Sequence, residues 1–276
     1  MNVKKYFDAL MNGNFDQAEA VLKENIPSKL LKFIWLDGGK DDDLKLNSLE
    51  QKELWFSNIS HFNDPFEFKF LIVNKEKLKK IFSEEAIKKI EDSLDWSHSI
   101  GISCLSNVEI DFLPMWSYYA NNHRGFCIEY EVMKNNCIFE VLYEPERVLI
   151  SNLIVELLNN IKKISSNDIV AQEKINAINK LNISNRILFQ NLFIKSSKWR
   201  HEKEFRIPYL LSNYPNGMNV PICDLGLKTN RVICGYKCPS ETQSKLNEIS
   251  KKIGCGNAYK INMSDTKYSV LEEIIE

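Results

Sequence analysis

The chain has 276 residues, of which 44% are hydrophobic and 11% aromatic, a composition typical of a folded protein and not of a disordered one. Its 36 Lys and Arg residues are balanced by 37 Asp and Glu residues. That balance argues against a protein that coats nucleic acid through bulk charge, although it leaves room for a local basic strip.

The seven cysteines form no Cys-x-x-Cys pair, and the spacing of Cys234 and Cys238 is followed by no second pair of ligands. We therefore expect no zinc site and interpret the cysteines as reduced thiols. The N-terminal segment lacks the apolar run of a signal peptide, and no segment approaches the roughly 18 apolar residues that span a bilayer. We expect a cytoplasmic protein without a membrane partner.

The first half of the chain predicts short elements separated by turn signals. Pro27 interrupts the helical pattern and favours a strand after it, because proline lacks the backbone N–H that a helix requires. In chain order we expect two helices within 3–24, a strand at 29–36, a loop at 37–43, a strand at 54–57, a loop at 58–70 leading to a strand, one amphipathic helix at 75–95, a strand at 100–106, a short helix from Pro114 to near Gly125, and a strand at 125–132.

The second half contains a stretch rich in Ile, Asn, Lys and Ser, at about 150–195, whose pattern predicts a two-helix insertion. Strands are expected at 204–211, 230–235 and 258–264, with a helix at 240–253. Strands and helices alternate irregularly, so we predict an α+β fold with a mixed, largely antiparallel sheet and flanking helices. Residues 29–276 are expected to form this domain. Residues 1–28 are expected to form a helical N-terminal appendage that binds a partner protein.

Three polar clusters carry the candidate chemistry. The first is HFNDPFEF, in which Asn63-Asp64-Pro65 is a turn signal. It is either a structural Asx-turn or a polar pair, set between Phe62 and Phe66, that contacts a ligand.

The second cluster is PMWSYYANNHRGFCIEYE. In a helix, Trp116, Tyr119 and His123 fall on one face, which is either a core stripe or a ligand-binding surface. Arg124 next to His123 favours a neutral imidazole, and Gly125 permits close approach of another backbone.

The third cluster is KSSKWRHEKEFRI. Along a strand that starts at residue 202, Glu202, Glu204 and Arg206 share one face. They are either a solvated row of ion pairs or a general base or cation stabiliser held by Arg206. Trp199 offers a stacking surface just upstream.

These motifs together resemble a known family. LWFS, FNDPFEF, GISCLS, MWSYYANNHRGFCIEYE and K-x-x-K-W-x-x-E-x-E-F-R occur in order between about Leu30 and Gly235, as in the bacterial family called domain of unknown function 2971. The sequence departs from the family where Ile34 replaces an arginine of its opening motif, and in the long segment at 150–195.

Members of this family are distantly similar to ADP-ribosyltransferases, which break the nicotinamide–ribose bond of NAD. That resemblance implies a basic or His residue on the first strand that binds NAD, an aromatic or Ser residue in the middle, and a late glutamate that stabilises the positive charge developing on the ribose. The catalytic residues it implies are Glu204, Glu202, Tyr119 and His123. The residues it implies for NAD binding are Lys32, Asn63, Asp64, Trp116, Tyr118, Trp199 and Arg206.

The expected function is that of an NAD-dependent ADP-ribosyltransferase-like effector in bacterial defence, or an NAD glycohydrolase, with NAD as substrate and no metal. Its acceptor is expected to be a macromolecule, either protein or nucleic acid. The alternative is a non-enzymatic nucleotide-sensing or protein-interaction domain. A metal nuclease using Asp64, Glu67 and Glu129 lacks any spacing signature. The ADP-ribosyltransferase hypothesis also predicts that Asn63, Trp116, His123 and Glu204 lie in one cleft.

Overall fold

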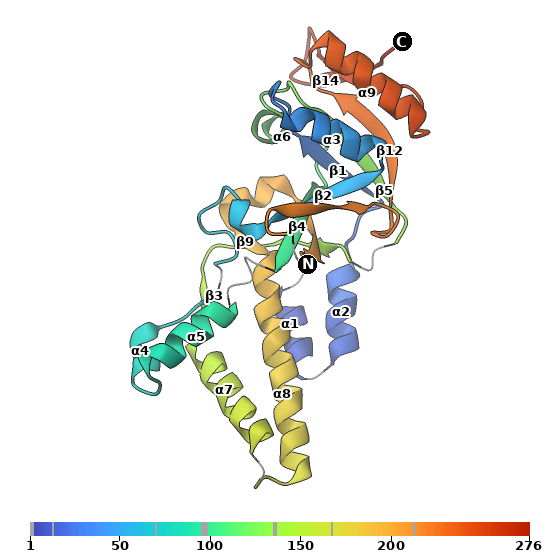
Figure 1. The fold of residues 1–276 in the computed structure, drawn as a ribbon. Coiled ribbons are helices and arrows are strands. Elements are labelled where there is room, and N and C mark those ends of the chain that lie inside the picture. Colours follow the sequence, from blue (N-terminus) through green and yellow to red (C-terminus); the bar gives the residue numbers. More distant parts are fainter. Residues whose placement is uncertain are drawn as a thin grey trace. The chain divides into compact units, whose positions relative to one another are not determined.

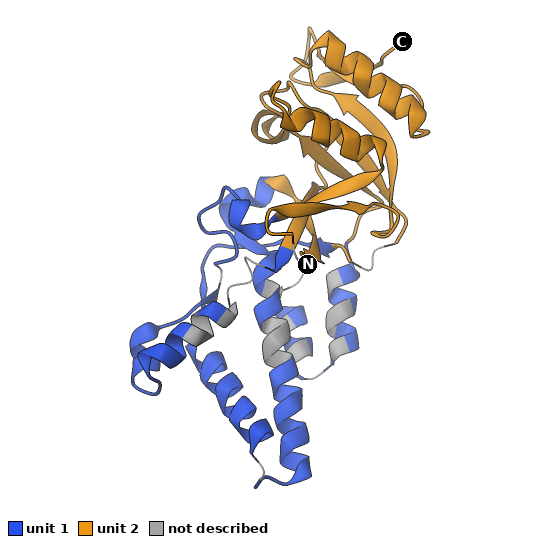
Figure 2. Ribbon diagram, viewed as in Figure 1, with its two compact units in different colours: residues 1–25, 58–100, 139–201 blue, residues 26–57, 101–138, 202–276 orange. Residues whose placement is uncertain are grey.

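The computed structural model describes residues 3–12, 14–69, 71–94, 99–134, 137–166, 168–211 and 214–276 (Figure 1). The chain divides into two compact units that alternate along the sequence (Figure 2). Unit 1 comprises Met1–Asn25, Asn58–Ile100 and Phe139–His201, and unit 2 comprises Ile26–Ser57, Gly101–Ile138 and Glu202–Glu276. The segment predicted as an N-terminal appendage falls in unit 1 with the predicted insertion. The division into an appendage at 1–28 and a domain at 29–276 stays a prediction.

Unit 2 is built on a sheet in the order β11-β2-β4-β1-β5-β12-β13-β14, and β10 also pairs with β4. Neighbouring strands run antiparallel at β1–β4, β1–β5, β11–β2, β12–β5 and β13–β14, whereas β12 and β13 are parallel. The predicted α+β class is therefore confirmed. The strands are β1 (Lys29–Ile34), β2 (Glu53–Asn58), β4 (Ile100–Ser106), β5 (Phe126–Val132), β10 (Glu204–Leu210), β11 (Gly217–Pro221), β12 (Leu227–Cys234), β13 (Tyr259–Met263) and β14 (Val270–Ile274).

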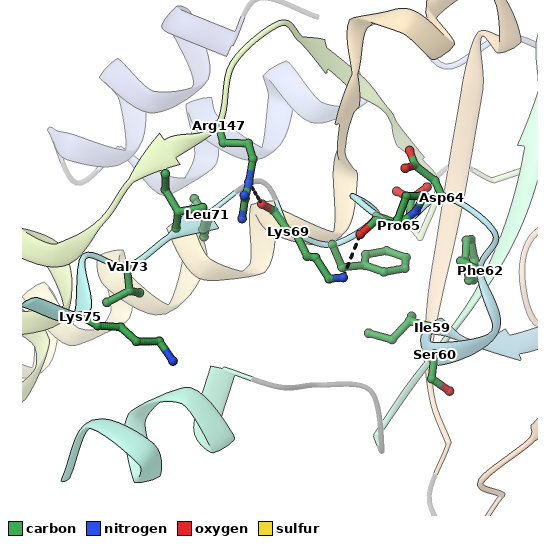
Figure 3. A pocket seen from close by; sticks show the side chains of 13 residues that line it. Ile59, Ser60, Phe62, Asp64, Pro65, Lys69, Leu71, Val73, Lys75 and Arg147 are labelled. Atoms are coloured by element: carbon green, nitrogen blue, oxygen red, sulfur yellow. Dashed lines mark hydrogen bonds between the residues drawn. The ribbon is translucent and has the colours of Figure 1, made fainter. Parts of the chain in front are cut away.

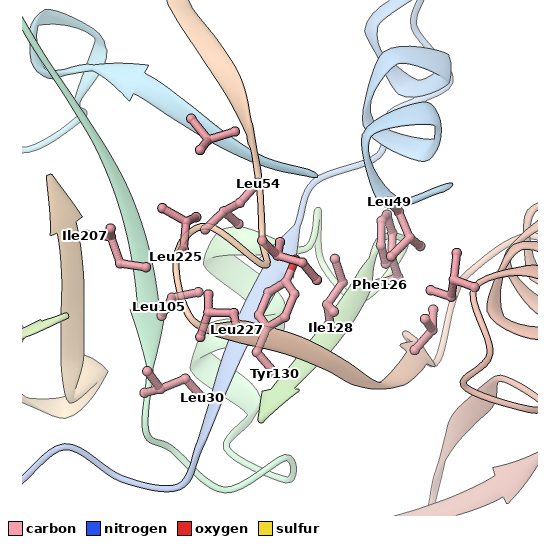
Figure 4. Close-up of a cluster of buried hydrophobic side chains, with 14 of the residues drawn as sticks. Leu30, Leu49, Leu54, Leu105, Phe126, Ile128, Tyr130, Ile207, Leu225 and Leu227 are labelled. Atoms are coloured by element: carbon pink, nitrogen blue, oxygen red, sulfur yellow. The ribbon is translucent and has the colours of Figure 1, made fainter. Parts of the chain in front are cut away.

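The central strands of unit 2 are apolar on both faces. On β5, Phe126, Ile128 and Tyr130 belong to one buried cluster, while Cys127 belongs to another, because successive side chains of a strand point to opposite faces. Figure 4 shows the first cluster, to which β1, β4, β10 and β12 also contribute. Helices α3 (Asp41–Glu50) and α9 (Ser240–Lys252) add Leu49 and Leu246 to it.

The second cluster is covered by helix α6 (Leu113–Tyr119), which supplies Met115 and Trp116 against Leu31 and Phe33 of β1. The sheet of unit 2 is thus packed on both faces, and this packing determines which polar residues lie buried near it.

Unit 1 is mainly helical. The described helices are α1 (Val3–Met11), α2 (Phe15–Lys23), α4 (Lys75–Lys79), α5 (Glu84–Leu94), α7 (Ser151–Ser165) and α8 (Ala171–Phe189), with 3₁₀ turns η1 (Ile59–His61), η2 (Gln190–Phe193) and η3 (Ser197–Glu202). Short strands accompany them: β3 (Leu71–Ile72), β6 (Phe139–Glu140), β7 (Leu142–Glu144), β8 (Val148–Leu149) and β9 (Ile194–Ser196). Helices α7 and α8 confirm the two helices predicted at about 150–195, and the interpretation of this segment as an insertion stays a prediction. The described part of the chain contains no helix long and apolar enough to cross a membrane.

Several predicted boundaries are wrong for local reasons. The single helix expected at 75–95 is two helices, α4 and α5, and the Ser83 hydroxyl accepts a hydrogen bond from Ala86 N at the start of the second. The helix expected to reach Gly125 ends at Tyr119, because Asn121, Asn122 and His123 have left-handed backbones with φ of 48°, 51° and 70°. Strands β11 and β14 were not predicted.

Candidate functional site

The candidate site begins with an ion pair on β10. Arg206 Nε lies 2.7 Å from Glu204 Oε1, and Arg206 Nη2 lies 3.2 Å from Glu204 Oε2. Arg206 is 0% exposed and Glu204 5%, so the pair is buried and is not a solvated row on a surface. A buried carboxylate needs a counter-charge and hydrogen bonds to be tolerated, and the two-pronged contact with Arg206 supplies both.

Glu202 lies outside the strand, in η3, so the prediction of a strand starting at residue 202 is wrong. Lys203 has a left-handed backbone with φ of 45°, which separates the two glutamates. The Tyr119 hydroxyl donates a hydrogen bond to Glu202 Oε1, and Ser106 Oγ donates one to the Glu202 carbonyl. The two carboxylates therefore have different partners, Tyr119 for Glu202 and Arg206 for Glu204.

Lys32 reaches this region from β1. Strand β1 pairs with β4 at Leu31 opposite Ser106, and Lys32 Nζ then donates to the Cys104 carbonyl at 2.9 Å and to Ser103 Oγ at 3.3 Å. Burial lowers the pKa of Lys32, while the charge of Glu204 opposes that shift. The charge of the predicted late glutamate thus acts on the predicted first-strand cation, although the two side chains form no ion pair.

Cys104 lies among these charged groups. Burial raises the pKa of its thiol and Glu204 raises it further, while Arg206 and Lys32 act in the opposite direction. The thiol is therefore held in its neutral form, which disfavours a role as a nucleophile. Neither Cys104 nor its neighbour Ser103 was predicted as a site residue, since the motif GISCLS has the pattern of an ordinary buried strand.

Trp116 is part of the core. It is 0% exposed, its Nε1 donates to the Ile110 carbonyl at 2.7 Å, and its ring meets Phe33 edge-on at 5.1 Å. No exposed surface of Trp116 remains for a nicotinamide ring, so in this structure the residue acts by positioning α6.

His123 stacks on the Trp116 ring with centroids 6.2 Å apart and planes 9° apart. Its Nδ1 is buried and has no hydrogen-bond partner among the described residues. Burial lowers the pKa of His123, and Lys237 lowers it further, so the imidazole is neutral at pH 7, in line with the expected neutral form. The cation that contributes to this lowered pKa is Lys237, whereas Arg124 was expected to have that effect. The predicted role of Gly125 in close backbone approach also agrees with the geometry, because a Cβ there would lie 1.9 Å from the Ile34 carbonyl oxygen.

The remaining predicted site residues have varied surroundings. Tyr118 is 59% exposed and meets Tyr119 edge-on at 6.5 Å. Asn63, Asp64 and Trp199 belong to unit 1, whereas the other predicted residues belong to unit 2. A cleft shared by Asn63, Trp116, His123 and Glu204 stays a prediction.

Within unit 1, Asp64 forms the expected Asx-turn, in which its Oδ1 accepts a hydrogen bond from Phe66 N at 2.9 Å. Trp199 is half-buried, and Lys195 Nζ lies 5.2 Å from the centroid of its ring. Lys195 also lies 3.7 Å from Glu67 Oε2, with both side chains buried. Sequence reasoning missed this pair because its members are far apart in the chain.

In the described parts of the chain, no group of three or more His, Cys, Asp or Glu side chains is placed to hold a metal ion. Asp64, Glu67 and Glu129, the residues considered for a metal nuclease, do not form such a group there.

The comparisons with known proteins agree with the family resemblance. Residues 115–207 match the family described as protein of unknown function (DUF2971), so the resemblance predicted from the motifs is confirmed for that stretch. The stretch runs from α6 to β10 and includes Tyr119, Glu202, Glu204 and Arg206, whereas the motifs at 30–106 lie outside it. The searches of curated proteins and of solved structures gave no match.

Proposed function

We propose that this protein is an NAD-dependent ADP-ribosyltransferase-like enzyme whose site in unit 2 contains Lys32, Tyr119, Glu202, Glu204 and Arg206. The observation that carries the proposal is the hydrogen bond that joins Tyr119 to Glu202, next to the buried pair of Glu204 and Arg206, in the same unit as Lys32. Lys32 and Glu204 attract each other, and Tyr119 is bonded to Glu202, two residues from Glu204. The family resemblance implies the same combination of a first-strand cation, a central tyrosine and a late glutamate.

The proposed chemistry is cleavage of the bond between the ribose C1′ and the nicotinamide nitrogen. The bonding electron pair leaves with nicotinamide, and the ribosyl group becomes cationic. Glu204, fixed by Arg206, stabilises that charge with a carboxylate whose orientation requires no rearrangement during reaction. A nucleophile of the acceptor, or water, then bonds to C1′ and releases its proton.

The other residues have supporting roles in this proposal. Lys32 attracts a phosphate of NAD, and its ammonium already lies in an environment that favours an anionic partner because burial destabilises its charge. Tyr119 is half-buried and presents its ring beside Glu202. Glu202 orients the acceptor. The acceptor is a protein or nucleic acid, and the biological setting is bacterial defence, as the resemblance implies.

The test is an assay of nicotinamide release from NAD by the full chain, with and without cell extract as a source of acceptor. Release in the wild type, with loss of about 100–1000-fold in Glu204→Gln, supports the proposal. Because Gln leaves the buried Arg206 without its counter-charge, activity is expressed per folded molecule after the folded fraction has been measured by circular dichroism.

Glu129→Gln is the matched control. Glu129 is also a buried glutamate of unit 2, and Arg231 Nη2 lies 2.7 Å from its Oε2, yet it belongs to no proposed catalytic step. Its activity per folded molecule should equal that of the wild type. Absence of nicotinamide release under all conditions would refute the enzyme and leave the non-enzymatic nucleotide-sensing or protein-interaction domain as the function.

A further inference from the structure

Unit 1 contains a pocket of about 700 Å³ that is lined entirely by its own residues, from the segment between Ile59 and Lys75 together with Arg147 (Figure 3). Its volume lies within the roughly 300–1,000 Å³ of sites that enclose a small organic ligand. Apolar side chains such as Ile59, Leu71 and Val73 form much of the wall. Of the residues expected at the NAD site, Asp64 lines the pocket, whereas Lys32, Tyr119, Glu202, Glu204 and Arg206 do not.

Two cationic side chains that line this pocket, Lys69 and Arg147, contact backbone carbonyls. Lys69 Nζ donates to the Pro65 carbonyl at 2.8 Å, and Arg147 Nε donates to the Lys69 carbonyl at 2.5 Å (Figure 3). In the described chain, neither Lys69 nor Arg147 has a carboxylate within ion-pair distance. Lys75 is a third basic lining residue. The charges of Lys69 and Arg147 favour an anionic ligand, and the guanidinium N–H groups of Arg147 that are not used by the Lys69 carbonyl suit a phosphate.

Two acidic side chains, Asp64 and Glu67, also line the pocket, and they differ in their partners. Glu67 lies 3.7 Å from Lys195, so it already has a counter-charge. Asp64 is 7% exposed, its Oδ1 is occupied by Phe66 N, and its Oδ2 is buried with no hydrogen-bond partner in the described part of the chain. A buried acceptor without a donor is costly, which favours a ligand that brings an O–H or N–H group.

Two aromatic rings complete the wall. Phe62 and Phe68 meet edge-on with centroids 5.1 Å apart. Phe68 has a left-handed backbone, with φ of 57°, which a bulky residue rarely adopts. Such strain persists where the surrounding structure over-determines it and is enriched in ligand-binding sites. The rings offer a planar group both a face and an edge.

We propose that this pocket binds a nucleotide, with its phosphates at Lys69 and Arg147 and its base against Phe62 and Phe68. A nucleotide combines the three features that the pocket requires, namely negative charge, hydrogen-bond donors and a planar apolar ring. The proposal is independent of the NAD chemistry in unit 2.

The test is calorimetric titration of the full chain with three probes: ADP, adenosine and inorganic pyrophosphate. ADP carries ring, hydroxyls and charge, adenosine lacks the charge, and pyrophosphate lacks the ring. ADP should bind at least about ten-fold more tightly than either of the others, and its affinity should fall as salt is added. Equal affinity for ADP and pyrophosphate would show that the pocket is a general anion site that does not recognise the ring. Equal affinity for ADP and adenosine would show that the phosphates make no favourable contact. Either result, like an absence of ADP binding, overturns the proposal.

Variants locate the binding. Arg147→Gln should weaken ADP binding about ten-fold or more while leaving adenosine unchanged. Arg200→Gln is the matched control, because Arg200 is another exposed arginine of unit 1 that donates to a backbone carbonyl, that of Tyr143 at 3.0 Å, but does not line the pocket. Equal effects of the two substitutions would overturn the assignment. The NAD assay measures nicotinamide release and this test measures ADP affinity and its dependence on Arg147, so failure of the NAD assay and failure of this proposal are separate outcomes.

Discussion

Glu204 Oε1 lies 2.7 Å from Arg206 Nε, and the two residues are separated by one position on the buried strand β10. Residues i and i+2 of a strand point to the same side, so the strand itself brings the charges together. Phe205, which lies between them in the sequence, and Ile207, which follows Arg206, pack into the main apolar cluster. A single strand thus contributes to the core with one face and holds an enclosed ion pair on the other.

The ion pair makes a prediction about stability. Glu204→Ala or Arg206→Ala alone removes one member of this buried ion pair and should reduce the free energy of unfolding by about 3–5 kcal/mol. The double replacement Glu204→Leu with Arg206→Met should be less destabilising than either single change, because neither member of the pair then remains as a buried charge without the other. Urea denaturation of the three variants measures this. Additive losses in the double variant would contradict the coupling.

Glu129 makes a prediction about acid stability. Burial alone would raise its pKa, but hydrogen bonds from Arg231, Asn230 and Lys29 outweigh it and lower the pKa to about 2 from the usual 4.5. A lowered folded-state pKa stabilises the fold above pH 4.5, and this contribution is lost as the pH falls toward about 2. Glu129→Gln should therefore be clearly destabilising at pH 7, with a difference that shrinks between those two values.

The measurement for Glu129 is urea denaturation of wild type and variant at a series of pH values. Glu241→Gln is the control, because its partner Lys245 forms an exposed pair at 3.0 Å that contributes little at any pH. A difference for Glu129→Gln that does not change with pH would show that packing, and not charge, accounts for its effect.

His123 makes a prediction about titration. Burial lowers its pKa below 6.5, and Lys237 adds to the shift. The neutral form is therefore favoured by the fold, and the stability it confers is present above pH 6.5 and decreases as the pH falls below it. In an NMR titration the His123 ring signals should have a midpoint below 6.5. Lys237→Gln should move that midpoint upward, whereas Lys237→Arg, which keeps the charge, should leave it in place.

Gly125 makes a prediction about packing. A Cβ on Gly125 would lie 1.9 Å from the Ile34 carbonyl oxygen, a backbone atom that cannot move aside. Gly125→Ala should cost about 3 kcal/mol or more in thermal or urea denaturation. At Gly101 a Cβ would instead meet the flexible Leu211 side chain at 2.7 Å, so Gly101→Ala should cost less. Equal losses would show that the Gly125 contact relaxes.

Much of the candidate site could be predicted because it lies in short stretches with strong local signals. The Asx-turn at Asp64 follows from an acceptor side chain two residues before a free backbone N–H, and the pairing of Glu204 with Arg206 follows from strand periodicity. The register around Glu202 could not be predicted in this way. The left-handed Lys203 has no residue-type signature, because lysine favours other conformations and tertiary contacts impose this one.

The sequence by itself determined the α+β class, the positions of most helices and strands, and the family resemblance, because alternating and helical apolar patterns and ordered motifs are local properties. Only the tertiary structure decided which polar residues are enclosed and what they contact. It placed Trp116 in the core, joined Tyr119 to Glu202 across 83 positions of the chain, and left Asp64 Oδ2 without a donor in the described residues. Burial and long-range hydrogen bonding depend on how distant segments pack, and periodicity along a strand or helix carries no information about that packing.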